Sequence, residues 1–258
     1  MATFLFDDII FGPVWSRRLG ESLGINLLPA GRKVCNFNCI YCECGLTPDS
    51  SKPEKFPDAK IVKQLLYSKL QEMKDNKDYL DSITFAGNGE PTLHPEFPQI
   101  IEEAIASRNH LFPDAKIAVL SNATLIGRKQ VFDALLKADL NILKLDSAIE
   151  DTLKLINCPR GSYNLKEITD TLKLFNGKMI IQTLFLRGTC NGRKIDNTTD
   201  KEVDAWLAVL QQIKPERVML YSLARDTAVN DLEKVNAGEL NAIADRIENA
   251  GIKTQVTP

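Results

Sequence analysis

Three cysteines, Cys35, Cys39 and Cys42, follow one another with gaps of three and then two residues. Cysteine thiolates are the usual ligands of iron–sulfur clusters, and a [4Fe–4S] cluster normally takes four of them. A run that supplies three leaves one iron without a protein ligand, and an open coordination position distinguishes a catalytic metal site from a closed structural one. The spacing therefore favours a [4Fe–4S] cluster with one iron open to a further ligand.

Two other chemistries fit parts of this run. Cys39, Cys42 and Cys44 could belong to a structural zinc knuckle, but such a site needs a second ligand pair about 12–20 residues further on, and the sequence has none there. Both histidines are distant in sequence, although His94 could come close in space. A redox pair made of Cys39 and Cys42 would leave Cys35 unexplained.

A second motif, Gly87-Asn88-Gly89-Glu90-Pro91, directly follows residues 82–86, which have the composition of a buried strand. Glycines at this place let the backbone approach a ligand closely, so that its free amide and carbonyl groups can pair with polar ligand atoms. Taken alone, a glycine pair after a strand is more often only a turn.

The two motifs together resemble those of the radical S-adenosylmethionine (radical SAM) superfamily. The superfamily signature is Cys-x3-Cys-x2-Cys with an aromatic residue before the last cysteine, a place that Tyr41 fills. The resemblance implies that the three cysteines bind the cluster and that the amino and carboxylate groups of S-adenosylmethionine (SAM) chelate the open iron. It also implies that residues 87–90 hold the methionine amino group, because residues 88–91 resemble the Gly-Gly-Glu-Pro segment of the family. Asn88 stands in place of the first glycine of that segment.

The elements that must position these motifs alternate regularly along the chain. Runs rich in Val, Ile and Leu predict six strands, at residues 24–29, 82–86, 116–120, 141–145, 178–185 and 217–221, with a possible short edge strand at 253–256. Helical spacing between them predicts covering helices, with Asp58 as an N-cap, residues 199–202 as a capping box and Pro95 as a first helical residue. The predicted buried face of the first helix consists of Ile61, Val62, Leu65, Leu66, Leu70 and Met73. This alternation implies a parallel sheet covered by helices. Six strands favour a partial (βα)6 TIM-like barrel, which the resemblance also implies, over a flat doubly wound sheet.

Neither a linker nor a fixed-period repeat divides the 258 residues, so we predict one domain, 1–258. Within it, residues 1–23 would form an irregular N-terminal extension, 46–58 a surface connection and 187–200 a polar loop. The net charge of −2 gives no electrostatic footprint for nucleic acid. Without signal-peptide features or an apolar run of about 20 residues, we expect a cytoplasmic protein that does not contact a membrane.

Reactive groups of parallel α/β proteins collect at the carboxyl ends of the strands. Ser121 and Asn122 end the third predicted strand and suit the ribose hydroxyls or the methionine carboxylate of SAM, although helix capping explains them equally well. Lys144 and Asp146 lie two residues apart and share one strand face. They form either a buried ion pair or a ligand or substrate contact, resembling the charged pair on this strand in glycyl-radical activating enzymes. The Lys144 amine could also form a Schiff base with a carbonyl substrate.

Later strands add further candidates. Gln182, on the fifth strand, is predicted to contact the cofactor. Arg225, after the sixth, could bind a carboxylate with its fork of donors or form an exposed salt bridge. We therefore predict catalytic roles for Lys144 and Arg225. The spare cysteines lack a motif spacing, so they either bind an auxiliary cluster or are small buried apolar residues: Cys44, Cys158 and Cys190.

The resemblance also implies a reaction. A low-potential donor of the flavodoxin or ferredoxin type reduces the cluster, and the electron splits SAM into methionine and a 5′-deoxyadenosyl radical that abstracts hydrogen from a substrate. From residues 11–20 through 87–95 to 144–146, the chain resembles the bacterial branch related to wyosine-type tRNA-modifying enzymes. Its acidity argues against tRNA, and its compactness is closer to activating enzymes that generate a glycyl radical on a partner protein. A tRNA base and a partner protein are therefore competing substrate hypotheses. A non-catalytic iron–sulfur or zinc protein is the hypothesis from another class.

Overall fold

The computed structural model describes residues 4–49 and 55–258. Part of the predicted surface connection, residues 50–54, lies outside them. In the described residues, an eight-stranded sheet with the order β1-β2-β3-β4-β5-β6-β9-β11 carries the fold. Its members are β1 (Ile10–Ser16), β2 (Gly20–Ile25), β3 (Ser82–Phe85), β4 (Lys116–Ser121), β5 (Leu140–Lys144), β6 (Ile180–Leu184), β9 (Arg217–Tyr221) and β11 (Lys253–Thr257).

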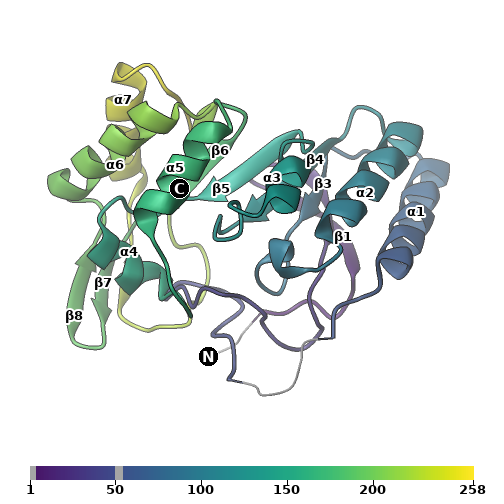
Figure 1. Ribbon diagram of the computed structural model, residues 1–258, viewed down its shortest axis with the longest axis horizontal. Helices are drawn as coiled ribbons and strands as arrows, with labels where there is room; N and C mark the ends of the chain where they lie inside the picture. The colour runs from purple at the N-terminus through teal and green to yellow at the C-terminus, as the bar shows by residue number, and fades with distance from the viewer. Residues whose placement is uncertain (1–3, 50–54) are drawn as a thin grey trace.

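The strand order decides between the two predicted architectures. From β2 to β11 every neighbouring pair is parallel, and each strand joins the sheet beside the one before it. A doubly wound sheet reverses direction at a switch point, and this sheet has no reversal. β1 and β11 lie at opposite edges, so the sheet curls without closing (Figure 1). The predicted partial barrel is confirmed, with β11 added as the predicted edge strand.

Helices cover the outer face of this sheet. They are α1 (Ala59–Asn76), α2 (Phe97–Leu111), α3 (Lys129–Leu135), α4 (Glu150–Asn157), α5 (Leu165–Leu174), α6 (Asp200–Ile213) and α7 (Ala237–Asn249). Figure 1 shows α1 to α3 on one side of the molecule and α5 to α7 on the other, while the loop of residues 26–49 that follows β2 crosses below them. The main core lies between helices and sheet, so the carboxyl ends of the strands remain available to the loops.

The helix starts follow the predicted caps with some differences. Asp58 caps α1 by accepting a hydrogen bond from the Lys60 amide at 2.8 Å. The predicted buried face of α1 included Ile61 and Leu65, which are 48% and 44% exposed. That part of the prediction is wrong, because the buried stripe is narrower: it consists of Ala59, Val62, Leu66, Leu70 and Met73.

Two further helix starts deviate from the prediction. Pro95 precedes α2, which begins at Phe97 after a short 3-10 turn, η1 (Pro91–Leu93). Thr199 does cap α6, accepting from the Glu202 amide at 3.4 Å. The carboxylate of Glu202 does not complete the capping box, because it accepts a hydrogen bond from the Ser147 hydroxyl at 2.7 Å instead.

Of the predicted N-terminal extension, residues 1–3 lie outside the described residues, and residues 4–23 are not irregular as we predicted. β1 and β2 form an antiparallel hairpin in which Trp15 pairs with Glu21, and β2 is the first parallel strand of the barrel. The proline and glycine that suggested irregularity lie where the register shifts, between Phe11 and Val14. An edge strand tolerates Pro13 at such a bulge, because no inner neighbour requires its missing N–H.

The predicted loop at 187–200 is also wrong in part. β7 (Leu186–Cys190) and β8 (Arg193–Asp196) form a hairpin, and β10 (Leu232–Lys234) pairs with β7 to give a three-stranded sheet. Asn191 and Gly192 connect β7 and β8 with φ values of 50° and 72°. Asn-Gly favours the two-residue hairpin turn with positive φ at both positions.

No helix among the described residues is both long and apolar enough to cross a membrane.

Candidate functional site

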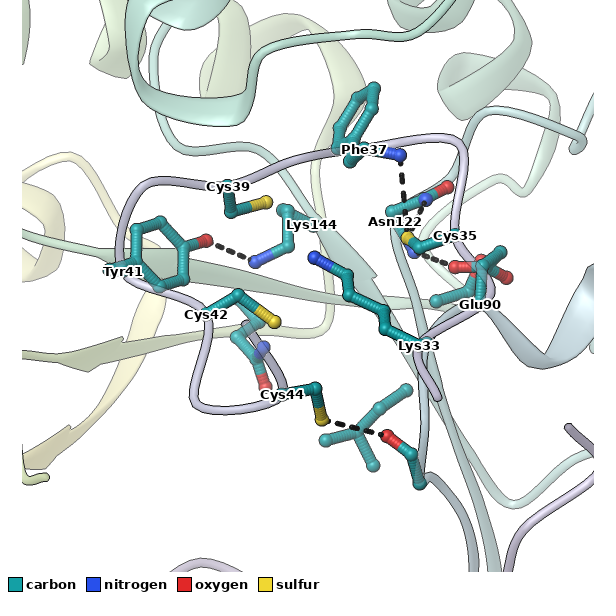
Figure 2. A pocket seen from close by; sticks show the side chains of 15 residues that line it. Lys33, Cys35, Phe37, Cys39, Tyr41, Cys42, Cys44, Glu90, Asn122 and Lys144 are labelled. Carbon is teal, nitrogen blue, oxygen red and sulfur yellow. Dashed lines mark hydrogen bonds between the residues drawn. The ribbon is translucent and has the colours of Figure 1, made fainter. Parts of the chain in front are cut away.

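The thiols of Cys35, Cys39 and Cys42 line one cavity of about 140 Å³ at the carboxyl ends of the strands (Figure 2). All three are free thiols. They lie on the loop that follows β2, and both sides of this loop are fixed by backbone hydrogen bonds. Val34 donates to the Asn88 carbonyl at 2.8 Å, and Ile40 donates to the Ile156 carbonyl at 2.9 Å. The cysteine loop is therefore fixed to the β3 end of the sheet on one side and to α4 on the other.

The glycine segment reaches the same cavity, which Gly87, Gly89 and Glu90 help to line. Gly89 pairs with Val34 in an isolated parallel bridge and has a φ of 137°. A Cβ atom at Gly89 would lie 1.9 Å from the Val34 carbonyl oxygen. Only glycine allows the two motifs to approach this closely, so the close approach explains the residue type.

Gly89→Ala is expected to destabilise the protein by about 3 kcal/mol or more, because it combines a strained φ with a backbone clash. Urea denaturation of the apoprotein measures the change. Gly127→Ala is the matched control, since a Cβ there meets no atom within 4 Å and its φ is ordinary. A G89A stability equal to that of G127A would contradict the close contact.

The position of the Asn88 side chain does not support the predicted role of this residue in cofactor binding. Its side chain is fully buried and does not line the cavity. The amide group accepts from the Phe6 N–H at 2.8 Å and donates to the carbonyls of Phe6 and Pro29, at 2.8 and 3.0 Å. Asn88 thus ties the N-terminal segment to the barrel, and this need for an amide explains why a residue other than glycine occupies the position.

Glu90 organises the two residues that end β4. Its carboxylate accepts hydrogen bonds from the Ser121 hydroxyl at 2.8 Å and from the backbone N–H of Asn122 at 2.6 Å. The backbone N–H and the hydroxyl of Thr92 donate to the same carboxylate. Burial raises the pKa of the Glu90 carboxyl, and these donors oppose the rise. Ser121 and Asn122 line the cavity, and the Asn122 side-chain amide lies 3.5 Å from the Cys35 sulfur.

Lys144, Tyr41 and Asp146 form a buried charged network beside Cys39. The Lys144 ammonium lies 3.5 Å from the Asp146 carboxylate, and the Tyr41 hydroxyl hydrogen-bonds to both groups. Burial would lower the pKa of Lys144, but the charge of Asp146, acting together with Tyr221, Cys39 and Cys42, outweighs burial, so that the pKa is raised. Burial and Asp146 also raise the pKa of Tyr41. The predicted inward pair is present: Lys144 and Tyr41 line the cavity, whereas Asp146 lies behind them.

A second cavity of about 250 Å³ adjoins the first and shares its lining residues Tyr41, Cys42, Leu120 and Gln182. Gln182 accepts from the Arg18 guanidinium at 2.6 Å and donates to the Tyr221 hydroxyl at 3.1 Å. The guanidinium also lies over the Tyr221 ring, 4.5 Å from its centre. Gln182 therefore stands at the boundary between the cysteine cavity and a second, arginine-lined space.

The sequence model of the Radical SAM superfamily matches residues 33–192, more than half of the chain, and this range holds both motifs. The chain belongs to the radical SAM superfamily. A protein of Brachyspira hyodysenteriae named GTPase Obg is 30% identical over 252 residues, which make up 96% of this chain and 35% of that protein. The chain thus spans about a third of the length of that relative. A UPF0026 protein of Synechocystis is 34% identical over 218 residues, 82% of this chain and 74% of the relative.

Solved structures show the same fold. A structure of TYW1 with a lysine–pyruvate adduct bound superposes with a TM-score of 0.62 at 16% identity, covering 88% of this chain and 73% of that one. Membership of the radical SAM superfamily implies SAM and an iron–sulfur cluster. In the described residues, no three His, Cys, Asp or Glu side chains are grouped to hold a single metal ion. Thiols spread around a cavity fit a cluster better, because each thiolate then binds a different iron.

Lys33 is a cavity residue of this radical SAM protein that the sequence analysis missed. Its side chain is buried, and the ammonium donates to the Gly45 carbonyl at 2.9 Å. Burial would lower the pKa of Lys33, but the neighbouring thiols of Cys42, Cys35 and Cys39 raise it overall. Its place two residues before the first motif cysteine was the available signal, although a lysine beside a loop ordinarily indicates only a solvated surface.

The spare cysteines do not share one location. Cys44 lines the cavity and lies 3.4 Å from the Gly87 carbonyl oxygen. A hydrogen bond from Cys44 lowers the pKa of Cys42, with the charge of Lys33 acting in the same direction. Cys158 and Cys190 belong to an apolar cluster behind the loop and do not line the cavity. The three are therefore not gathered around a common point.

Arg225 lies apart from the cysteine cavity and lines the second one. Its guanidinium forms a salt bridge with Glu43 at 2.7 Å, and its side chain is 65% exposed. Of the predicted site residues, the structure thus brings together the three cysteines, Tyr41, Gly87, Gly89, Glu90, Ser121, Asn122, Lys144 and Gln182. It places Asn88, Asp146 and Arg225 outside the cavity wall.

Proposed function

We propose that the protein is a radical SAM enzyme that binds a [4Fe–4S] cluster through Cys35, Cys39 and Cys42 and cleaves SAM reductively. One observation carries the proposal: the three motif thiols line the same cavity as the Gly87–Glu90 segment and the end of β4. The bound cluster and SAM would supply a one-electron cleavage to methionine and a 5′-deoxyadenosyl radical. A low-potential donor of the flavodoxin or ferredoxin type, a cytoplasmic location and a single domain complete the proposal.

The residues of the cavity divide the binding of SAM among them. The half-buried backbone of Gly87 and Gly89, which lines the cavity, would receive the methionine amino group, which is a donor and needs carbonyl acceptors. Ser121 and Asn122, held by Glu90, offer short polar groups for the carboxylate or the ribose hydroxyls. Gln182, which lines both cavities, would contact the adenosine part of SAM. Lys144 keeps its proton through Asp146 and presents a fixed positive charge beside Tyr41.

A tRNA base is the substrate that we propose. The resemblance to wyosine-type enzymes and the fold shared with TYW1 support it. The second cavity supports it as well, because its wall includes Arg17, Arg18 and Arg225 although the chain as a whole is acidic. Trp15, two residues before Arg17, is 74% exposed and offers a surface on which a base can stack. Arginines and an exposed aromatic ring together suit an RNA strand.

Anaerobic reconstitution tests the reaction. The protein is loaded with iron and sulfide, reduced, and studied by electron paramagnetic resonance with and without SAM. We expect the spectrum of the reduced cluster to change when SAM is added and 5′-deoxyadenosine to form. A spectrum that SAM leaves unchanged, without 5′-deoxyadenosine, would favour an electron carrier.

The double variant Arg17→Gln/Arg18→Gln tests the substrate. If both arginines bind phosphates, tRNA binding weakens in the variant, and the slope of log affinity against log salt decreases by about one for each phosphate that is no longer neutralised. Lys129→Gln, which removes a charge from an exposed helix position, is the control and should bind tRNA as the wild type does. If the double variant binds tRNA with the affinity and salt slope of the wild type, the surface around Arg17 and Arg18 does not bind tRNA. If the wild type itself does not bind tRNA, a protein substrate is favoured.

A further inference from the structure

Lys33 places a positive charge inside the cysteine cavity. Its side chain is only 3% exposed, and it lines the cavity together with all three motif thiols. Figure 2 shows the ammonium pointing into the space between the cysteines, away from the outer surface of the loop. A lysine in this position loses the hydration of its charge, so the surrounding groups must compensate for that loss.

The protein compensates the two cavity lysines differently. Lys144 has Asp146 at 3.5 Å and is neutralised by it. In the described part of the chain, Lys33 has no carboxylate at ion-pair distance, and its hydrogen-bond partners are the neutral carbonyl of Gly45 and the thiol of Cys42. The carboxylate of Glu90, which also lines the cavity, already accepts from four donors. The thiols are the groups left to carry the opposing negative charge.

We propose that Lys33 compensates the charge of the cluster and raises its reduction potential. The inference rests on the cluster of the proposed function. Reduction adds one negative charge to the cluster, and a fixed buried cation nearby stabilises the reduced form more than the oxidised form, because Coulomb energies are large where water is excluded. Net charge around a cluster is one of the factors that set its potential.

The hydrogen bond to Gly45 suggests a simpler role, in which Lys33 only closes the loop that carries the cysteines. Three substitutions separate the two roles. Lys33→Arg keeps the charge and the donor, Lys33→Gln keeps a donor without the charge, and Lys33→Met removes both. Lys129→Gln, at an exposed position of α3, controls for a change in net charge alone.

The experiment is a potentiometric titration of each reconstituted variant, followed by electron paramagnetic resonance, with iron and sulfide content and apoprotein unfolding measured in parallel. At the midpoint potential of the wild type, we expect K33Q and K33M to show a ratio of reduced to oxidised cluster about tenfold lower, which equals a shift of about 59 mV for a one-electron couple. K33R and K129Q should stay within about twofold of the wild type.

Each outcome decides the inference. A K33Q protein whose apo form is as stable as the wild type but which assembles no cluster, while K33R assembles one, supports the charge role as well. A full cluster in K33Q with a wild-type potential overturns the inference, and so does an equal reduction in cluster content in K33R and K33Q. The proposed function fails in a different way, because then the wild type itself would hold no cluster that responds to SAM.

Discussion

Cys39→Ala is expected to abolish the cluster and, with it, the formation of 5′-deoxyadenosine. The three motif thiols bind three of the four irons, so a cluster that loses one thiolate has two open irons and is not retained. The side-chain amide of Asn157 donates to the Cys39 sulfur at 3.4 Å, and this N–H group is a donor, not a ligand. Iron and sulfide content, the visible absorption of the reconstituted protein and chromatography of the reaction products measure the loss.

Two serine substitutions provide the controls. Cys158→Ser replaces a thiol that donates to the Leu155 carbonyl outside the cavity, and a hydroxyl can make the same hydrogen bond, so cluster and activity should persist. Cys44→Ser is the more demanding control because Cys44 shares the cavity. We expect it to keep the cluster and the response to SAM. Loss of the cluster in C44S would make Cys44 a fourth ligand and would contradict an open iron, and activity in C39A would contradict the whole assignment.

The sequence allowed the strands and the two motifs to be predicted because their signals are local. Runs of apolar β-branched residues form strands wherever both faces are buried, and the cysteines necessarily share one loop. Their joint placement in a cavity with residues 87–90 followed from parallel topology, which collects strand ends at one edge. The β7–β8 hairpin was missed although Asn191-Gly192 is a strong turn signal, because the polar residues around it suggested an exposed loop.

Contacts between distant segments were not predictable from such local signals. Nothing in the sequence indicates that Asn88 reaches the backbone of Phe6, 82 positions earlier, and so the replacement of a motif glycine was interpreted as part of the binding site. The burial of Lys33 was not predictable for the same reason, because its ammonium donates to the carbonyl of Gly45, 12 positions further along the chain. The Lys144–Asp146 pair was predictable because the period of a strand places both residues on one face. The contact of this pair with Tyr41 was not predictable, because Tyr41 lies on the cysteine loop, far from both residues in sequence.

Asp146→Asn is expected to destabilise the apoprotein by about 3–5 kcal/mol, since it leaves the Lys144 ammonium buried without its anion. The Asp146 carboxylate also accepts from the Leu184 amide at 3.0 Å and from Asn157 at 2.6 Å, and an amide cannot serve all of these donors. Urea denaturation measures the loss. The double variant Lys144→Met/Asp146→Asn removes both charges and should recover part of it, which a double-mutant cycle quantifies.

The pH dependence of D146N distinguishes a charge effect from a packing effect. In the wild type, Asp146 keeps the pKa of Lys144 above its ordinary value, so the stabilisation from this charge is fully present at all pH values below the pKa of an unfolded lysine. In the variant, the charge of Asp146, the largest of the influences that oppose burial, is gone, and we expect burial to lower the pKa of Lys144 below its ordinary value. The unfolded state then binds more protons than the folded state, so the stability of D146N rises with pH. The difference between the unfolding free energies of the wild type and D146N should therefore become smaller between pH 7 and about pH 10. A difference that stays constant over this range, or one below about 1 kcal/mol, would show that the pair does not stabilise the barrel through its charges.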